Sequence, residues 1–367
     1  KTSIFYFYNF LKTCYNSWVS AVAALENLPF RTGENIMKFR KTGAIAALSM
    51  AAVVSLSACS VSQPTQFNAR WRKAVTDASE NVDLGGAKEI AEYNVSFEKG
   101  GNDAYSVNYS NGKYKTELSA ENGNYVYETT LSIDVSYTFG AETASFAGEN
   151  GDTVYSKVIA KSTQNGLKPV SSVKKVAAHV PASAAPVSLT GSNGCYREYF
   201  YVITTDYSAN SCTIEYFADK TFETAHPSYK AQTHTFEPDD KYSLIDNEEL
   251  LLAVRAIDKT STLYVYNTAA GKLQSVSVSK SNAVKTEFSF MIAGKEEAAA
   301  KHDVSYVPYS LTINDTTPGA TQKVWVAETT KAENNEYRNV ILKMETPLSF
   351  NLGTLVYELS SVDFLDD

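Results

Sequence analysis

The chain has 367 residues, a formal net charge of −8 at pH 7 and a composition that is 44% hydrophobic and 12% aromatic. This length can bury a sizeable core in one large domain or two small ones. The acidic balance argues against nucleic acid as a partner, because phosphate contacts need clustered Lys and Arg, and the 4 cysteines are too few for a disulfide framework.

The first recognisable motif is a leader that ends at Cys59. Met37 is followed by a basic segment and then by an apolar stretch over 43–55, which is short for a membrane span and typical of a signal peptide. Residues 56–59 read Leu-Ser-Ala-Cys and resemble the lipobox of bacterial lipoproteins. The resemblance implies that the Cys59 thiol receives a diacylglycerol and that signal peptidase II cuts before it. The alternative is an ordinary secretory signal with a chance cysteine.

This leader divides the chain into segments and predicts a location. The mature protein is expected on the extracytoplasmic side of the cell membrane, held to the bilayer by acyl chains on Cys59. Six basic and two acidic residues precede Cys59, so the mature net charge is −12, and no polybasic segment adds to this contact. The expected segments are an upstream translation artefact over 1–36, a signal peptide over 37–58, a tether over 59–66, and a single large β-rich domain over 67–367 with a candidate lobe boundary at 181–194.

The first half of the domain is expected to begin with an amphipathic helix over 67–79 and to continue as β-strands. Residues 125–139 carry the clearest signal, because apolar and polar side chains alternate along them, as in a strand with one apolar and one wet face. Short Gly- and Asn-rich connections predict antiparallel pairing. The strands expected here are 92–99, 104–109, 113–120, 125–139, 153–163 and 169–180, with a turn at 110–112 between the second and third.

The second half repeats this style. Along its last predicted strand, apolar residues keep one parity up to Leu352 and change parity after Gly353. A change of one residue at a glycine predicts a β-bulge. The strands expected in this half are 196–207, 211–218, 262–267, 273–280, 286–292, 304–313, 321–330 and 338–352.

Residues 246–258 predict a buried helix among these strands. Asp246 and Glu249 have the spacing of a capping box, and the residues that follow leave almost no polar face. Such a helix is expected to lie in the hollow of a curved sheet against the apolar face of 125–139. Full burial is predicted for Leu250, Leu251, Val254 and Ile257.

Arg255 is the most informative single residue of this helix. A guanidinium within an apolar helix must be paired or must reach water. One interpretation is a structural ion pair with a carboxylate on a strand. The other is recognition of an anionic head group or carboxylate of a ligand.

Motifs for catalysis are missing from the sequence, which predicts a protein that is not an enzyme and has no cofactor. Neither a nucleophile elbow nor a phosphate loop nor a dinucleotide fingerprint is present. His226 and His234 could reach one metal, and the acidic turn over 237–240 could collect Ca²⁺, yet solvated surface residues explain both better, so no metal site is predicted. Cys195 has no neighbouring base in the sequence that would activate it as a nucleophile.

The 24 tyrosines raise the question of glycan binding. Tyrosine forms strands well and sits well at the boundary between core and water, so packing explains most of them. Tyr196, Tyr199 and Tyr201, with Phe200 between them, are dense enough to form an exposed aromatic platform.

Together these patterns predict a mainly β fold: a long-stranded, curved antiparallel sheet, half-barrel-like, with one or two helices packed on it. The architecture resembles the LolA/LppX-type half-barrel lipoprotein carriers, whose curved sheet wraps helices over a cavity for acyl chains. The resemblance implies a non-enzymatic binding lipoprotein that holds an apolar or amphipathic ligand in the hollow of the sheet. The alternative is a cell-surface interaction or adhesion module with a solid core and exposed aromatic strands. A hollow above ~300 Å³ favours the first and a filled core the second.

Overall fold

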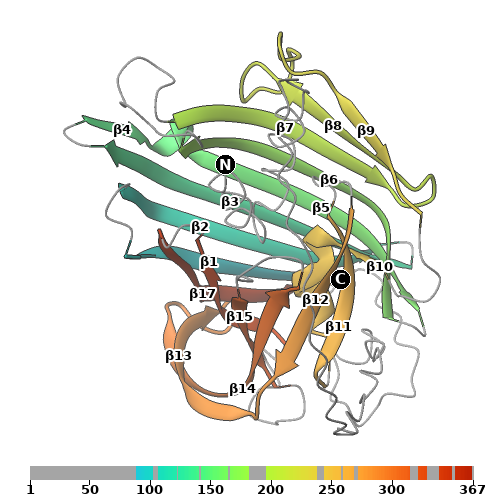
Figure 1. Cartoon of the computed structure of the whole chain (residues 1–367). Helices are drawn as coiled ribbons and strands as arrows, with labels where there is room; N and C mark the ends of the chain where they lie inside the picture. The colour runs from blue at the N-terminus through green and yellow to red at the C-terminus, as the bar shows by residue number, and fades with distance from the viewer. Residues whose placement is uncertain are drawn as a thin grey trace, which may run out of the picture.

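The computed structural model describes residues 88–101, 106–121, 123–139, 142–163, 166–181, 196–237, 244–257, 259–267, 272–314, 321–328, 339–348 and 352–365. The predicted leader, Cys59, the tether, the helix over 67–79, Cys195 and most of 181–194 lie outside the described residues. Within the described residues, seventeen strands form one sheet, which confirms the prediction of a mainly β fold with long strands. Figure 1 shows how the strands are arranged.

The strands are β1 (Lys88–Lys99), β2 (Ser106–Glu121), β3 (Asn124–Phe139), β4 (Glu142–Phe146), β5 (Asp152–Thr163), β6 (Gly166–Pro181), β7 (Tyr196–Asp206), β8 (Ser211–Phe217), β9 (Gln232–Thr235), β10 (Leu244–Asp246), β11 (Ser261–Asn267), β12 (Lys272–Lys280), β13 (Val284–Ile292), β14 (Ala300–Ile313), β15 (Thr321–Ala327), β16 (Ile341–Pro347) and β17 (Gly353–Leu365). The helical elements among the described residues are the short 3-10 helices η3 (Gly148–Asn150) and η4 (Asn247–Glu249) and the α-helix α3 (Leu250–Val254).

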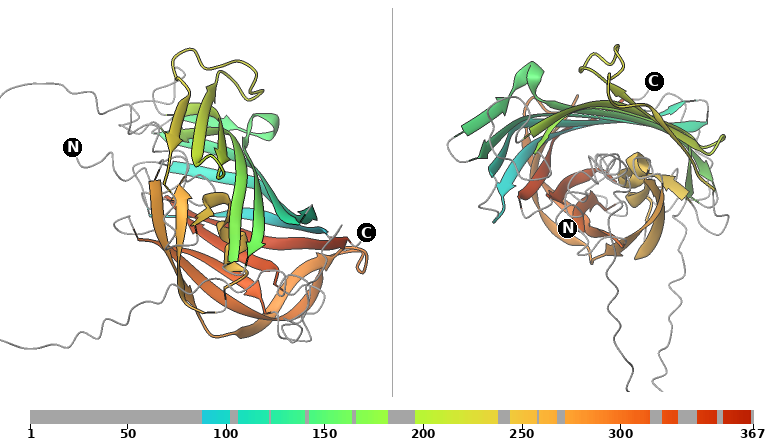
Figure 2. Two further views of the ribbon diagram at one scale, coloured as in Figure 1. Left: turned by 90° about the vertical axis from the view of Figure 1, so that its right-hand side faces the viewer. Right: turned by 45° about the horizontal axis from the view of Figure 1, so that its top comes forward.

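The first half of the molecule is a broad antiparallel sheet. Strands β1, β2, β3, β5, β6, β7, β8 and β9 pair with one another in this order, and β4 adds to the far end of β3. Along β1 and β2 buried and exposed residues alternate over long stretches, as expected when one face covers a core. Figure 2 shows these strands as a curved arch.

The second half curls beneath this arch (Figure 2, right). Strands β11, β12, β14, β15, β16 and β17 pair in turn, and β17 joins the two halves by pairing with β1. β13 continues β12 along the same side of β14, and its last two residues pair with β17 in parallel. This contact closes β13 to β17 into a ring, so the sheet is barrel-like.

The turn predicted at 110–112 is wrong, because β2 runs through it as one strand with a bulge. The register against β3 shifts between Ser110 and Lys113. Asn111 takes up the distortion with a φ of 51°, a region that asparagine tolerates better than most residues. Gly112 is needed because a Cβ there would lie 2.6 Å from the Cβ of Val95. The Asn-Gly pair therefore bends a strand here and does not reverse it.

The bulge predicted at Gly353 is also wrong. The structure forms a hairpin in which β16 and β17 pair antiparallel, with Pro347 opposite Thr354. The amide of Leu348 donates to the carbonyl of Gly353 at 2.7 Å. Gly353 has a φ of 149°, and a Cβ there would collide with the carbonyl oxygen of Glu98. The change of parity in the sequence therefore marks a chain reversal.

The helix predicted in the hollow is present, although it is shorter than expected. α3 ends at Val254, after which three i to i−3 hydrogen bonds tighten the chain up to Ile257. Leu250, Leu251, Val254 and Ile257 are all buried, as predicted. Figure 2 shows the helix between the arch and the curled half.

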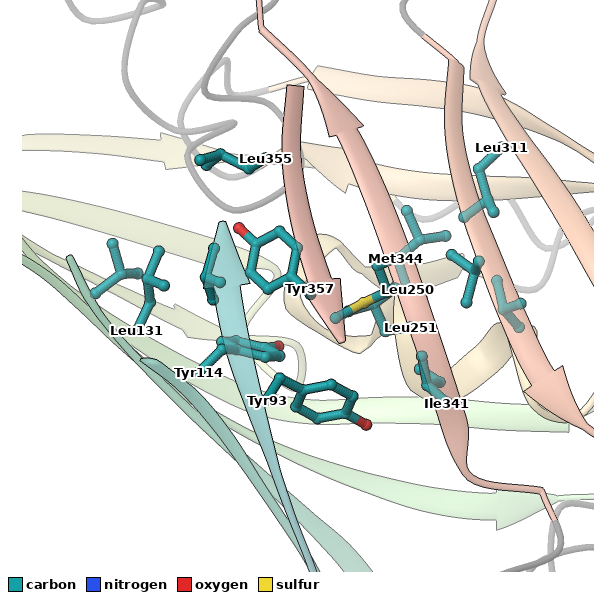
Figure 3. Packing of buried hydrophobic residues seen from close by; sticks show 14 of the residues in the cluster. Tyr93, Tyr114, Leu131, Leu250, Leu251, Leu311, Ile341, Met344, Leu355 and Tyr357 are labelled. Atoms are coloured by element: carbon teal, nitrogen blue, oxygen red, sulfur yellow. The ribbon is translucent and has the colours of Figure 1, made fainter. Parts of the chain in front are cut away.

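The face of β3 packs on this helix, which confirms the predicted partner. Leu252 and Ala256 share a buried cluster with Tyr125 and Tyr127 of β3. On the other side of the helix, Leu250 and Leu251 join the main core together with Met344 of β16 (Figure 3). The helix therefore fills space between both halves of the sheet.

Candidate functional site

Among the described residues, the predicted ligand hollow is packed at the place where the helix meets β3. A small cavity of about 20 Å³ remains there, lined by Tyr114, Thr129, Leu131, Val154, Asn247, Glu248, Leu250 and Leu251. This volume suits a single water molecule, whereas a site for a small molecule needs a few hundred Å³. The surroundings of the helix thus form a core with a polar rim at the N-terminal end of the helix.

Asp246 organises this polar rim. Its side chain accepts hydrogen bonds from Ser172 Oγ at 2.6 Å, from the hydroxyl of Tyr207 at 2.6 Å and from the amide of Glu248 at 2.8 Å. Asp246 is fully buried, and this burial, followed by the charge of Glu248, raises the pKa of its carboxyl. The capping box predicted with Glu249 is present, since the amide of Asp246 donates to Glu249 Oε2 at 3.2 Å.

Glu249 is a buried acid without a cationic partner among the described residues. One carboxyl oxygen serves the capping box, and the other, Oε1, is buried without a hydrogen-bond partner. Burial raises the pKa of Glu249 to about 8. The next acid along the chain differs, because Glu248 Oε1 accepts from the buried amine of Lys174 at 2.8 Å.

Arg255, a predicted ligand-binding residue, lies inside the protein and is paired. Its Nη1 and Nη2 donate to Glu89 Oε1 and Oε2 at 2.8 and 2.7 Å, a bidentate contact with β1. The side chains of Arg255 and Glu89 are 3% and 2% exposed. This geometry corresponds to the internal ion pair among the two interpretations of Arg255, and it ties the end of the helix to the first half of the sheet.

The exposed aromatic platform predicted on β7 is not formed. Tyr199 and Tyr201 are 9% and 3% exposed and belong to the main core, while Tyr196 is half-buried against it. The Tyr196 ring meets the Phe146 ring edge-on at 4.9 Å. Alternate residues of a strand face opposite sides of the sheet, so Tyr199 and Tyr201 share one face of β7. This face points inward.

The sequence did not predict that the buried His179 lies between two carboxylates. His179 Nδ1 lies 2.7 Å from Asp152 Oδ1, and its Nε2 lies 3.5 Å from Glu198 Oε1. The His179 ring stacks on Phe146 at 3.5 Å. Burial raises the pKa of Asp152. The group that faces Nε2 is a carboxylate, which accepts protons and does not provide the hydroxyl or thiol of an activated nucleophile.

The two histidines that were considered as metal ligands, His226 and His234, are both half-buried. His226 Nδ1 accepts hydrogen bonds from the amides of Ser228 and Tyr229 at 3.1 and 3.0 Å, and its ring stacks on Tyr229. His234 lies on β9 opposite Cys212. In the part of the chain that the structure describes, no group of three or more His, Cys, Asp or Glu side chains, the His179 group included, is arranged so that it could hold a metal ion.

None of the described helices has the length and apolar character needed to cross a membrane. The only α-helix among the elements above has five residues.

No protein-family model matches the chain, and no curated protein matches its sequence. Among solved structures, the chain is similar to one described as a beta-barrel-like protein of the domain of unknown function DUF1849 from Brucella abortus. The similarity has a TM-score of 0.43 and 9% sequence identity, and it covers 76% of this chain and 98% of that chain. A likeness of this size identifies neither a family nor a function.

Proposed function

We propose that this chain is a lipid-anchored lipoprotein on the extracytoplasmic side of the cell membrane, and that it acts by binding a partner at its surface and not by catalysis. The leader and the Leu-Ser-Ala-Cys sequence that ends at Cys59 support the anchor. A barrel-like body on a tether of a few residues stays close to the bilayer, where its outer faces and edges meet other molecules.

The packing around the short helix is the observation that favours binding at the surface over binding in the hollow of the sheet. Leu252 and Ala256 share a buried cluster with Tyr125 and Tyr127, and the cavity that the described residues leave at the N-terminal end of the helix has about 20 Å³. Arg255, which could have held an anionic head group, is occupied by Glu89. A ligand in this hollow would have to displace the helix together with its buried ion pair.

A second candidate is the carrier function, in which an apolar or amphipathic ligand enters the barrel-like interior. The observation in its favour is the continuous apolar lining, since the inner faces of both halves belong to one core cluster. Such a lining would receive an acyl chain if the helix moved aside.

The anchor is tested by growing cells that express the full chain with a fatty-acid analogue. Wild type is expected to incorporate the label, and Cys59→Ala is expected to lose it and to accumulate as unprocessed precursor. Cys195→Ala is the matched control and should label like wild type. Labelling of the Cys59→Ala protein would contradict the anchor.

Surface binding and carriage are separated by mass spectrometry of the full chain released gently from the membrane. Surface binding predicts only the covalent acyl chains. Detection of a stoichiometric, non-covalent lipid that leaves on denaturation would contradict surface binding and support the carrier function. The two experiments are independent, so either conclusion can fail alone.

A further inference from the structure

Among the described strands, none pairs with one edge of β13 over most of its length. Residues Val284–Phe290 pair with β14, whereas on the other side only Met291 and Ile292 pair with β17. Within the described ranges, no strand pairs with this other edge over 284–289. The first four residues of β13 are exposed, so both faces of the strand stand clear of the core there. Unpaired backbone amides and carbonyls at such an edge can hydrogen-bond a further strand.

The side chains at this edge favour one particular partner strand, namely a second copy of itself. Two identical edges that pair antiparallel about a two-fold axis perpendicular to the sheet place one residue opposite its own copy. Centring on Lys285 or on Glu287 would set like charges against each other, which destabilises a pair of strands. Centring on Thr286 places Lys285 opposite the Glu287 of the second copy, and the reverse contact forms by symmetry.

The opposite face of the strand fits the same register. Val284, which is 46% exposed, would lie opposite the Phe288 of the second copy. Phe288 already packs edge-on against Tyr306 at 5.3 Å within one molecule. Pairing would therefore cover an exposed apolar side chain with an aromatic pair, which is a favourable cross-strand contact.

Lysines on an edge strand ordinarily guard against pairing. In this register Lys285 does not prevent pairing, because each Lys285 lies opposite the carboxylate of Glu287 in the second copy. Within one molecule Glu287 lies directly opposite Asp303, a like-charge pair. Lys301 offsets it through a 2.7 Å contact to Glu287, and Lys285 offsets it through a 3.9 Å contact to Asp303. The Lys285 of a second copy would add a further cation beside Glu287.

We propose that the outer edge of β13 pairs antiparallel with the same edge of a second copy of this chain, centred on Thr286. This inference deepens the proposed surface binding by naming its partner. It rests on the proposed anchor for concentration only, because two molecules tethered to one membrane meet far more often than in solution.

A cysteine placed at the centre tests the pairing in the membranes of cells that express the full chain. Opposite residues of antiparallel strands have Cα atoms ~4.5–5.5 Å apart, within the reach of a disulfide. Thr286→Cys should therefore form a covalent homodimer on mild oxidation. In Ser289→Cys, the matched control, the two cysteines would lie ~20 Å apart and should stay unlinked. Failure of Thr286→Cys to link, equal linking of both variants, or linking to a different protein would overturn the proposal.

A charge exchange tests the register. Lys285→Glu or Glu287→Lys alone sets like charges opposite each other twice and should weaken self-association by about tenfold in analytical ultracentrifugation of the detergent-solubilised full chain. The double variant Lys285→Glu/Glu287→Lys should restore it. A double variant as weak as either single one would overturn the register. Fatty-acid labelling reports the anchor separately, so loss of pairing with intact labelling refutes this inference and leaves the anchor standing.

Discussion

The two ends of the short helix each bury a glutamate, and they do so in different ways. At the C-terminal end, Glu89 accepts both hydrogen bonds of the Arg255 fork. At the N-terminal end, Glu249 has one backbone donor, a carboxyl oxygen without a partner among the described residues, and a pKa raised to about 8. A buried carboxylate needs a cation, and a carboxyl that has none keeps its proton instead. The comparison predicts that the first end responds to removal of a partner and the second to pH.

Removing the cation at the C-terminal end should have the largest effect. Arg255→Met leaves Glu89 buried without its partner and should lower the free energy of unfolding by about 3–5 kcal/mol. Denaturant midpoints measure this change. The double variant Arg255→Met/Glu89→Leu removes the orphaned charge and should recover most of the loss. A midpoint of Arg255→Met equal to that of wild type would show that the pair is not buried as described.

Emptying the space between the two ends comes next. Leu251→Ala should cost ~2–5 kcal/mol, because a packed leucine leaves a cavity that the sheet cannot fully close. Leu273→Ala on β12 is the control, since Leu273 is 39% exposed and its loss should change stability by less than ~0.5 kcal/mol. Equal midpoints for the two variants would place the helix outside the core.

The N-terminal end should make stability depend on pH. The pKa of Glu249 is about 8 in the folded protein, against an ordinary value of 4.5, so the unfolded state loses this proton first as pH rises. The contribution of Glu249 to the free energy of unfolding is therefore fully present below pH 4.5 and is lost as the pH rises toward 8. Between pH 6 and pH 8 this loss amounts to about 2 kcal/mol.

Glu249→Gln tests this pH dependence because glutamine keeps the shape and cannot ionise. Its denaturant midpoint should vary less between pH 6 and pH 8 than that of wild type. If both proteins lose the same stability over this range, Glu249 is not the group that titrates.

The smallest effect is expected at a hydrogen bond of the polar rim. Tyr207→Phe removes the 2.6 Å bond to Asp246 while the ring still packs on Phe236, and should cost roughly 1 kcal/mol. Tyr155→Phe is the matched control, because that hydroxyl donates to Glu128, a partly exposed acid on the outer face. Thermal unfolding of the two variants would measure this difference in stability. Equal unfolding temperatures would show that the hydrogen bond to Asp246 does not stabilise the rim.

Local patterns in the sequence determined much of the fold. The alternation along 125–139 identified β3 and its inner face, and the spacing of Asp246 and Glu249 identified the capping box. The run of leucines after Glu249 was enough to predict a buried helix. These features depend on residues that are neighbours along the chain, where side-chain period and capping chemistry act directly.

Other features were decided only by the register between distant strands. Arg255 meets Glu89 from 166 residues away, and Asp152 meets His179 because β5 pairs with β6. The sequence showed that side chains alternate along β7, but it did not show which face of the strand turns inward and buries Tyr199 and Tyr201.

The two corrected connections show the same division. An Asn-Gly pair at 111–112 and a glycine at 353 each permit several backbone paths, since both residues tolerate positive φ. The close approach of Val95 to Gly112 and of Glu98 to Gly353 selects a bulge at the first and a hairpin at the second. The sequence by itself determined most of the long strands and the places where the chain can bend. Only the tertiary structure decided which bends reverse it, because steric contacts between distant strands make that choice.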